Sequence, residues 1–182
     1  MKELIKRNLS AKKVLILFVL TNIVYVFMLT VTIPAIMSYS HGIKILDMMP
    51  MGYDADYVNT LLNTLGEEGR QTYLVKQIPI DLIYPFLFGV SYCLVIAYFL
   101  NKIGKLESLF YLCLLPVVAG FFDYLENVGI IALLNTYPDI SARLIQVTSV
   151  FSIAKSTITT IYFILLIVVL IMFGINKMRS VK

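Results

Sequence analysis

Residues 109–134 read LFYLCLLPVVAGFFDYLENVGIIALL, an apolar stretch that carries Asp123 and Glu126 near its middle. A helix needs roughly 20 predominantly apolar residues to cross the hydrocarbon core of a bilayer. This stretch is long enough, and comparable stretches occur elsewhere in the chain. The sequence therefore predicts an all-α fold, an integral membrane four-helix bundle. The expected spans cover about residues 14–34, 78–100, 109–134 and 145–173.

The composition excludes a soluble fold. The chain has 182 residues, of which 59% are hydrophobic and 14% charged, and its mean hydropathy is +0.86. Soluble domains carry about 25% charged residues, so a soluble fold could not bury this excess of apolar side chains. The length fits a single membrane domain covering residues 1–182. The net charge of +4 comes from basic residues that mostly flank the spans, so no nucleic-acid partner is expected.

The same basic residues predict the orientation of the chain. Cytoplasmic flanks of membrane helices are enriched in Lys and Arg. Four basic residues flank the side that carries residues 35–77, whereas ten flank the opposite side. We therefore expect both termini in the cytoplasm, in a multi-pass protein of the plasma (cytoplasmic) membrane that contacts membrane lipids. The ten residues are Lys2, Lys6, Arg7, Lys12, Lys13, Lys102, Lys105, Lys177, Arg179 and Lys182.

Residues 35–77 are expected to form a long outer loop that contains a short amphipathic helix. Asp54 can cap this helix, and Gly66 can end it. Its apolar positions fall on one face, which would lie on the membrane surface, cover the bundle or pack on the loop itself. A second helical stretch from Glu67 onward is expected to lead into the second span. The apolar positions are Tyr57, Val58, Leu61, Leu62 and Leu65.

Polar side chains recur on one face of each of the last three spans, at helical spacings of three and four residues. Ionisable residues inside a membrane usually face the bundle interior or a water-filled cavity, so we expect the stripes to meet inside the bundle. The first span adds only Asn22 and Tyr25. The stripes consist of Gln77, Asp81, Tyr84, Phe88 and Ser91; Pro116, Gly120, Asp123, Glu126 and Asn127; and Thr148, Ser152, Lys155, Thr159 and Tyr162.

The deepest charged residues are Asp123 and Lys155. With a helical rise of about 1.5 Å per residue, each lies about 15–16 Å from the outer end of its span, and Glu126 lies about 4–5 Å nearer the outside. An unpaired lysine at that depth costs at least about 2.5–3.5 kcal/mol, so we expect Lys155 to pair with Asp123 or Glu126. One lysine cannot neutralise two acids. The surplus favours a shared proton, a bound cation or a further basic group such as Arg70.

These stripes predict a ligand site. Together with 12 Tyr and 11 Phe, they indicate an apolar pocket with a few convergent polar groups. The expected ligand is a lipid-like or small amphiphilic or cationic molecule. No metal and no cofactor are expected, because the spans contain no histidine and the two cysteines form no Cys-X-X-Cys pair. The ligand-binding candidates are Asp81, Tyr84, Asp123, Glu126, Asn127, Lys155 and Thr159, and the catalytic candidates are Asp123, Glu126 and Lys155.

Three other functions remain open. In an intramembrane enzyme acting on a lipid or isoprenoid-like substrate, Asp123 and Glu126 would act as acid and base while Lys155 holds charge on an intermediate. A proton or cation channel or transporter, as a homo-oligomer or alone, would move ions past Asp123. An accessory subunit would use its polar face to bind another membrane protein.

A small four-helix bundle with membrane-embedded acids resembles the emopamil-binding-protein family, whose members isomerise or bind sterols. That resemblance is one of topology and residue type, and it assigns no role to any residue.

Overall fold

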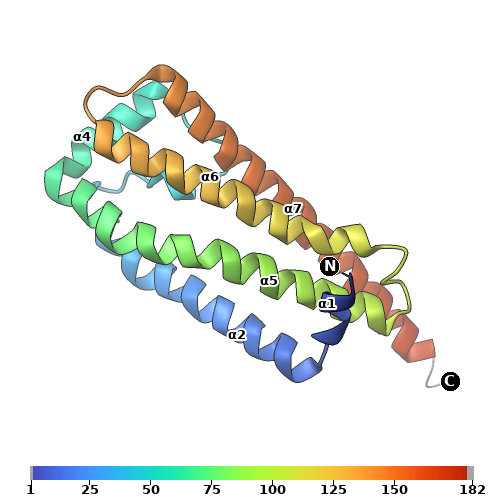
Figure 1. Ribbon diagram of the computed structural model, residues 1–182. Helices are drawn as coiled ribbons and strands as arrows, with labels where there is room; N and C mark the ends of the chain where they lie inside the picture. Colours follow the sequence, from blue (N-terminus) through green and yellow to red (C-terminus); the bar gives the residue numbers. More distant parts are fainter. Residues whose placement is uncertain (1, 180–182) are drawn as a thin grey trace.

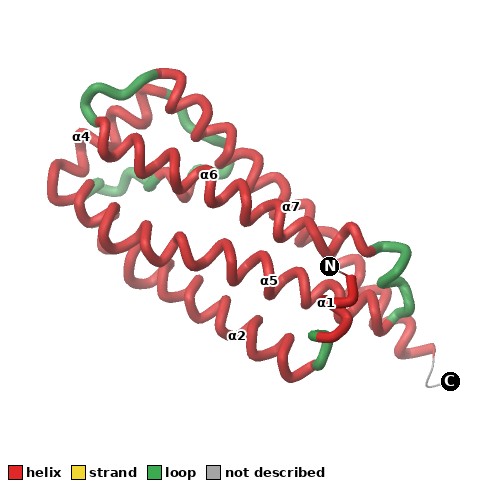
Figure 2. Tube along the Cα trace, in the orientation of Figure 1, coloured by secondary structure: helices red, strands yellow, loops and turns green. Residues whose placement is uncertain are grey.

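The computed structural model describes residues 2–179, which form a bundle of long helices (Figure 1). Within these residues there is no β-strand, and the few loops lie at the two ends of the bundle (Figure 2). Four helical segments are long and apolar enough to cross a membrane. The predicted all-α fold with four such helices is therefore confirmed, while Lys182 lies outside the described residues. The segments are Ala11–Met37, Ala55–Lys102, Phe110–Thr136 and Ala142–Arg179.

A short helix, α1 (Lys2–Arg7), precedes the first long segment. Lys6 forms an ion pair with Glu107, which lies in the link between the second and third long segments. The hydrogen bond and the charge of Lys6 lower the pKa of Glu107, and Glu107 in turn raises the pKa of Lys6. These contacts place α1 at the same end of the bundle as the end of α7 (Ala142–Arg179), as Figure 1 shows.

The first long segment changes its helical winding near its C-terminal end. Ser10 caps α2 (Ala11–Phe27) by accepting a hydrogen bond from the backbone N–H of Lys13. The π-helical turn η1 (Met28–Thr32) follows, and α3 (Ile33–Met37) completes the segment. Most of the apolar side chains of α2 are exposed, which fits a helix that faces lipid.

The second long segment begins within residues 35–77, where the sequence predicts two helical stretches. Asp54 caps α4 (Ala55–Thr72), and its carboxylate accepts a hydrogen bond of 2.8 Å from the backbone N–H of Tyr57. Gly66 adopts a φ of +62°, which kinks the helix, but the helix resumes at Glu67 as expected. The π-helical turn η3 (Tyr73–Gln77) then joins α4 to α5 (Ile78–Lys102). The predicted amphipathic helix and the predicted helical stretch from Glu67 onward are therefore both present within residues 35–77.

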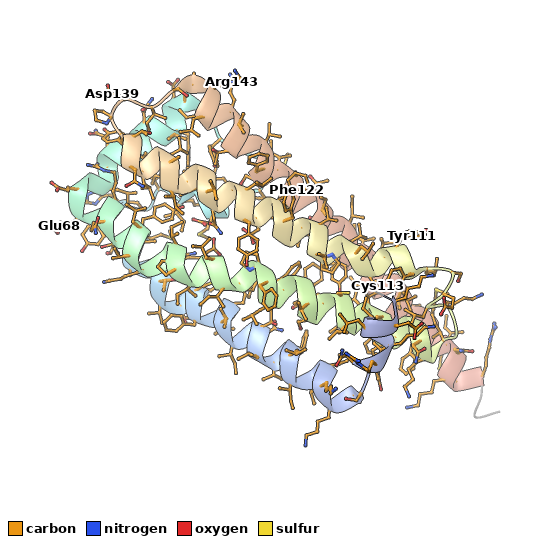
Figure 3. The ribbon with its side chains drawn as sticks, viewed as in Figure 1. Glu68, Tyr111, Cys113, Phe122, Asp139 and Arg143 are labelled. Carbon is orange, nitrogen blue, oxygen red and sulfur yellow. The ribbon has the colours of Figure 1, made fainter. Side chains whose placement is uncertain are left out.

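The apolar face of α4 covers one end of the bundle. Val58, Leu61 and Leu62 are fully buried. They belong to a core cluster that includes Ile45 from the preceding loop and Leu133 from α6 (Leu115–Thr136). The helix therefore packs both on the loop and on the bundle. Charged side chains at this end of the molecule include Glu68, Asp139 and Arg143 (Figure 3).

Helices α5, α6 and α7 pack closely on one another, while α2 packs mainly on α5. The 3₁₀ turn η4 (Phe110–Leu114) leads into α6. The backbones of α5 and α6 approach closely at Gly120, where an added Cβ would lie 2.7 Å from the carbonyl oxygen of Pro85. Small residues allow such close approach between membrane helices. The contact fixes how far α6 lies from the middle of α5.

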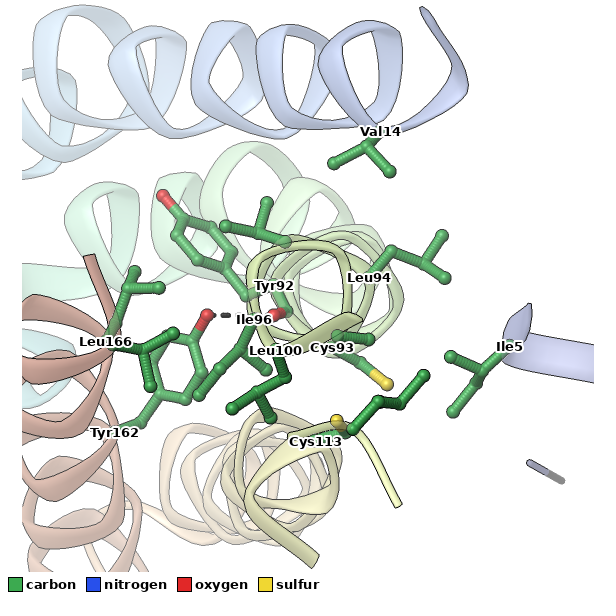
Figure 4. Close-up of a cluster of buried hydrophobic side chains, with 14 of the residues drawn as sticks. Ile5, Val14, Tyr92, Cys93, Leu94, Ile96, Leu100, Cys113, Tyr162 and Leu166 are labelled. Atoms are coloured by element: carbon green, nitrogen blue, oxygen red, sulfur yellow. Dashed lines mark hydrogen bonds between the residues drawn. The ribbon is translucent and has the colours of Figure 1, made fainter. Parts of the chain in front are cut away.

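A second core cluster fills the other end of the bundle, away from α4. Figure 4 shows Tyr162 of α7 beside Tyr92 of α5, and the Tyr162 hydroxyl donates a hydrogen bond of 2.8 Å to the Tyr92 carbonyl oxygen. Cys93 and Cys113 lie in the same cluster as free, buried thiols. Side chains from α5, α6 and α7 therefore close the bundle interior at this end.

The contact at Gly120 yields a test of this packing. Gly120→Ala forces the α5 and α6 backbones apart and should lower the free energy of unfolding by about 1–3 kcal/mol. Gly174→Ala is the matched control, because nothing lies within 4 Å of its added Cβ in α7. Thermal unfolding in lipid nanodiscs measures both. Equal unfolding temperatures for the two variants would contradict the close approach of α5 and α6.

Candidate functional site

A cavity of about 480 Å³ lies between α2 and α7, with α5 behind it. Tyr25 of α2 and Phe163 of α7 line opposite walls, and both remain partly exposed at the surface of the protein. The cavity therefore opens sideways, toward the surface that faces lipid if the four segments cross a membrane. Asp47 and Gln77 line its upper end, near α4, and Tyr92 lines its lower end.

An ion cluster joins α6 to α7 beside this cavity. The Lys155 ammonium lies 3.1 Å from a carboxylate oxygen of Asp123 and also pairs with Glu126. The Ser152 hydroxyl donates a hydrogen bond of 2.5 Å to the other Glu126 oxygen. The predicted pairing of Lys155 with an acid of α6 is therefore present, and Lys155 pairs with both Asp123 and Glu126. Lys155 and Asp123 line the cavity, while Glu126 is 1% exposed and lies behind them.

Asn127 compensates for a proline in α5. Pro85 has no backbone N–H, so the carbonyl oxygen of Asp81, four residues earlier, lacks its normal helical partner. The Asn127 side-chain amide donates a hydrogen bond of 3.0 Å to this oxygen. Asn127 is fully buried and does not line the cavity. Its position is explained by the backbone of α5, and this contact also fixes α6 against α5 beside the carboxyl group of Asp81.

Asp47 is a site residue that the sequence does not reveal. It lies on the 3₁₀ turn η2 (Leu46–Met48), in the loop before α4, and one of its carboxylate oxygens accepts a hydrogen bond from the Tyr73 hydroxyl. Its other oxygen is buried and has no hydrogen-bond partner. The Asp47 and Asp81 side chains are close enough to interact directly, and both line the cavity. Two carboxyl groups therefore meet at its upper end.

The loop that carries Asp47 is fixed on α7. Gly52 has a φ of +82°, and an added Cβ would lie 2.6 Å from the Ser149 hydroxyl oxygen, so a larger residue would not fit. The same hydroxyl accepts a hydrogen bond of 2.8 Å from the backbone N–H of Tyr53. Burial raises the pKa of Tyr53, and the charges of Glu126 and Asp47 raise it further, so its hydroxyl stays protonated. This loop closes the site from above.

Two π-helical turns face each other at the upper end of the cavity. Turn η1 contacts η3, and the Thr32 hydroxyl donates a hydrogen bond to the side-chain oxygen of Gln77. The Gln77 side-chain nitrogen is buried and has no partner. Single π-helical turns are frequent at functional sites, because they turn side chains away from the regular helical register. Here they bring Met28 and Gln77 to the cavity wall.

The lower part of the cavity is aromatic. The rings of Tyr25 and Tyr84 are stacked, with centroids 5.6 Å apart. Phe88 and Tyr92 continue the same face of α5, with centroids 4.7 Å apart, and Phe163 lies 5.5 Å from Tyr92. The Tyr92 hydroxyl donates a hydrogen bond of 3.3 Å to Asn22 of α2. The cavity therefore runs from a carboxylate-rich end to a ring-lined end.

The structure brings five of the predicted ligand-binding residues to the cavity wall. Glu126 and Asn127 do not line it, and Arg70 does not reach Asp81. Arg70 donates a hydrogen bond of 2.8 Å to the Leu62 carbonyl oxygen, across the kink at Gly66, and lies over the ring of Tyr137. The five cavity-lining residues are Asp81, Tyr84, Asp123, Lys155 and Thr159.

No protein-family model matches the chain, and no curated protein and no solved structure matches it either. Within residues 2–179, no group of three or more His, Cys, Asp or Glu side chains has an arrangement that could hold a metal ion.

The contact between Asn127 and α5 can be tested with a double-mutant cycle. Asn127→Ala should destabilise the protein by about 1–3 kcal/mol, because it leaves the Asp81 carbonyl oxygen without a partner. In a Pro85→Ala background the residue at position 85 regains its N–H, so the same substitution should cost at least about 0.5 kcal/mol less. Unfolding in nanodiscs measures all four proteins. An equal cost in both backgrounds would contradict this role of Asn127.

Proposed function

We propose that this protein binds a lipid-like amphiphile in the cavity between α2 and α7. The observation that carries the proposal is the cavity's polarity gradient. Asp47 and Asp81 line one end, and aromatic rings from α2, α5 and α7 line the other. A ligand site usually combines an apolar wall with a few convergent polar groups that fix the ligand's orientation. An amphiphile has the same division between a polar head and an apolar chain.

The sideways opening supports access from the membrane. Helix α2 packs mainly on α5, and α7 packs on α5 and α6. The cavity therefore lies in the space between α2 and α7. A lipid-soluble ligand can move in from the bilayer between these helices without crossing water. The ring-lined wall would then hold its chain by burying apolar surface that water would otherwise contact.

The acid–base pair that the sequence predicts for an enzyme is not assembled at the cavity wall. An acid–base mechanism needs two groups within hydrogen-bonding reach of the substrate. Asp123 lines the cavity, but Glu126 lies behind it, paired with Lys155 and bonded to Ser152. The geometry therefore offers one acid from the predicted pair to a ligand. The buried cluster around Tyr92 and Tyr162, below the cavity, also argues against a continuous path for ions.

We further propose that the upper end of the cavity, near α4, faces the outside of the plasma membrane and that both termini face the cytoplasm. The support is the excess of Lys and Arg at the opposite end. In this orientation the carboxyl groups of Asp47 and Asp81 lie in the outer half of the bilayer.

The ligand proposal predicts that a specific amphiphile remains bound after gentle extraction. We expect mass spectrometry of the protein in polymer-bounded lipid particles to detect a retained species beyond the bulk lipids. Thr159→Phe should reduce it several-fold, because Thr159 lines the cavity. Thr157→Phe is the matched control, because it adds the same ring to an exposed position on the same helix. Equal retention in both variants and the unmodified protein would count against the cavity.

The orientation can be measured by cysteine labelling, because Cys93 and Cys113 are buried and should give little background. Glu68→Cys, at the α4 end, should react with a membrane-impermeant maleimide added to intact cells. Ser108→Cys, in the link between α5 and α6, should react only after the cells are opened. Both positions are exposed. The reverse pattern would overturn the proposed orientation.

A further inference from the structure

The carboxyl groups around the cavity outnumber those with which Lys155 pairs. Four carboxyl groups act electrostatically on Lys155, those of Asp123, Glu126, Asp81 and Asp47. Lys155 makes ion pairs with Asp123 and Glu126. Among the ion pairs of residues 2–179, none involves Asp47 or Asp81. This second pair of acids therefore has no basic partner in the described part of the chain.

Asp47 and Asp81, the two acids without a basic partner, face the cavity. Asp81 is 4% exposed, and it lines the cavity together with Asp47. Two carboxylates this close, away from water, repel each other unless they share a proton or meet a cation. Asp47 already uses one oxygen to accept a hydrogen bond from Tyr73, while its other oxygen has no partner. A positively charged group placed between them would satisfy both acids.

The surroundings suit an organic cation better than a metal ion. The described residues offer no group of three or more metal-ligating side chains here. The cavity, at about 480 Å³, is also far larger than a single ion needs. Tyr84 lies one helical turn after Asp81 and stacks on Tyr25. Ammonium groups are attracted to the faces of aromatic rings, most strongly where water is excluded.

We propose that the ligand is a long-chain amine whose protonated amino group lies between Asp47 and Asp81. Its hydrocarbon chain follows the rings of Tyr84 and Phe88 toward Phe163 and the opening between α2 and α7. This inference rests on the proposed function and adds the chemical class of the ligand's head group. The positive charge of the ligand replaces the basic residue that the chain does not supply.

The chain contains no tryptophan, which permits a direct binding test. Phe163→Trp places a single fluorescent reporter at the mouth of the cavity, and Ile171→Trp places one on an exposed, apolar part of α7 outside it. Both proteins are studied in phosphatidylcholine nanodiscs with 9,10-dibromooctadecylamine, whose bromines quench nearby tryptophan. The matched ligands are its N-acetyl amide, the corresponding alcohol and a brominated lysophosphatidylethanolamine, which carries both an amine and a phosphate.

We expect the amine to quench the Phe163→Trp protein saturably, at a concentration at least about 30-fold lower than the amide or the alcohol requires. The lysophosphatidylethanolamine should bind more weakly than the free amine, because its phosphate meets the same carboxylates. Asp81→Asn and Asp47→Asn, each added to this reporter protein, should remove most of the preference for the amine. Glu107→Gln, which changes a carboxylate at the opposite end of the bundle, should leave the preference unaltered. The fluorescence of the Ile171→Trp protein should report only the bulk concentration of each ligand.

The other outcomes separate this inference from the proposed function. If the amine, amide and alcohol all quench the cavity reporter saturably and equally, the amphiphile site stands but the amine inference is wrong, and the two acids share a proton instead. If no ligand quenches the cavity reporter more than the reporter outside the cavity, both proposals fail. If the amine is preferred but Asp81→Asn and Asp47→Asn retain the preference, the placement of the amino group is wrong.

Discussion

The ion cluster of Lys155 with Asp123 and Glu126 is the constraint on which the rest of the structure depends. An isolated charge inside a membrane is costly, so these residues must meet across α6 and α7. The two acids are three residues apart on α6, and Ser152 and Lys155 are three residues apart on α7, so each pair occupies one helical face. Breaking one partner of such a buried cluster costs about 3–5 kcal/mol. The cluster therefore fixes the register of α6 against α7.

The contact between α5 and α6 extends this constraint to the cavity. Pro85 removes a hydrogen-bond donor from α5, Asn127 supplies one from α6, and Gly120 lets the two backbones approach. Asp81 and Tyr84 both line the cavity, and Tyr84 stacks on Tyr25 of α2. Because α2 packs mainly on α5, it leaves a gap beside α7 that the cavity occupies. With a residue other than proline at position 85, the Asp81 carbonyl oxygen would accept the normal helical hydrogen bond and would need no partner from α6.

The sequence predicts the parts of the molecule that follow helical periodicity. The spans, the cap at Asp54 and the pairing of Lys155 follow from hydropathy, spacing and depth. Asp47 could not be predicted, because it lies in a loop whose position is set by the fit of Gly52 on Ser149. The sequence also could not predict that Glu126 lies away from the cavity, since the three-residue spacing places it on the same broad face as Asp123. The roles predicted for Asp81, Tyr84, Asp123, Lys155 and Thr159 remain proposals.

The two pairs of acids, Asp123 with Glu126 and Asp47 with Asp81, are held in place by different interactions. This difference argues for a ligand. Asp123 and Glu126 are balanced by Lys155 within two packed helices. Asp47 is brought to Asp81 by a loop, which would tend to move away if two like charges met there without compensation. A ligand that neutralises this pair would favour the docked loop, since any species that binds one conformation stabilises it. Binding of the proposed ammonium group and docking of the loop through Gly52 and Ser149 are then a single coupled equilibrium.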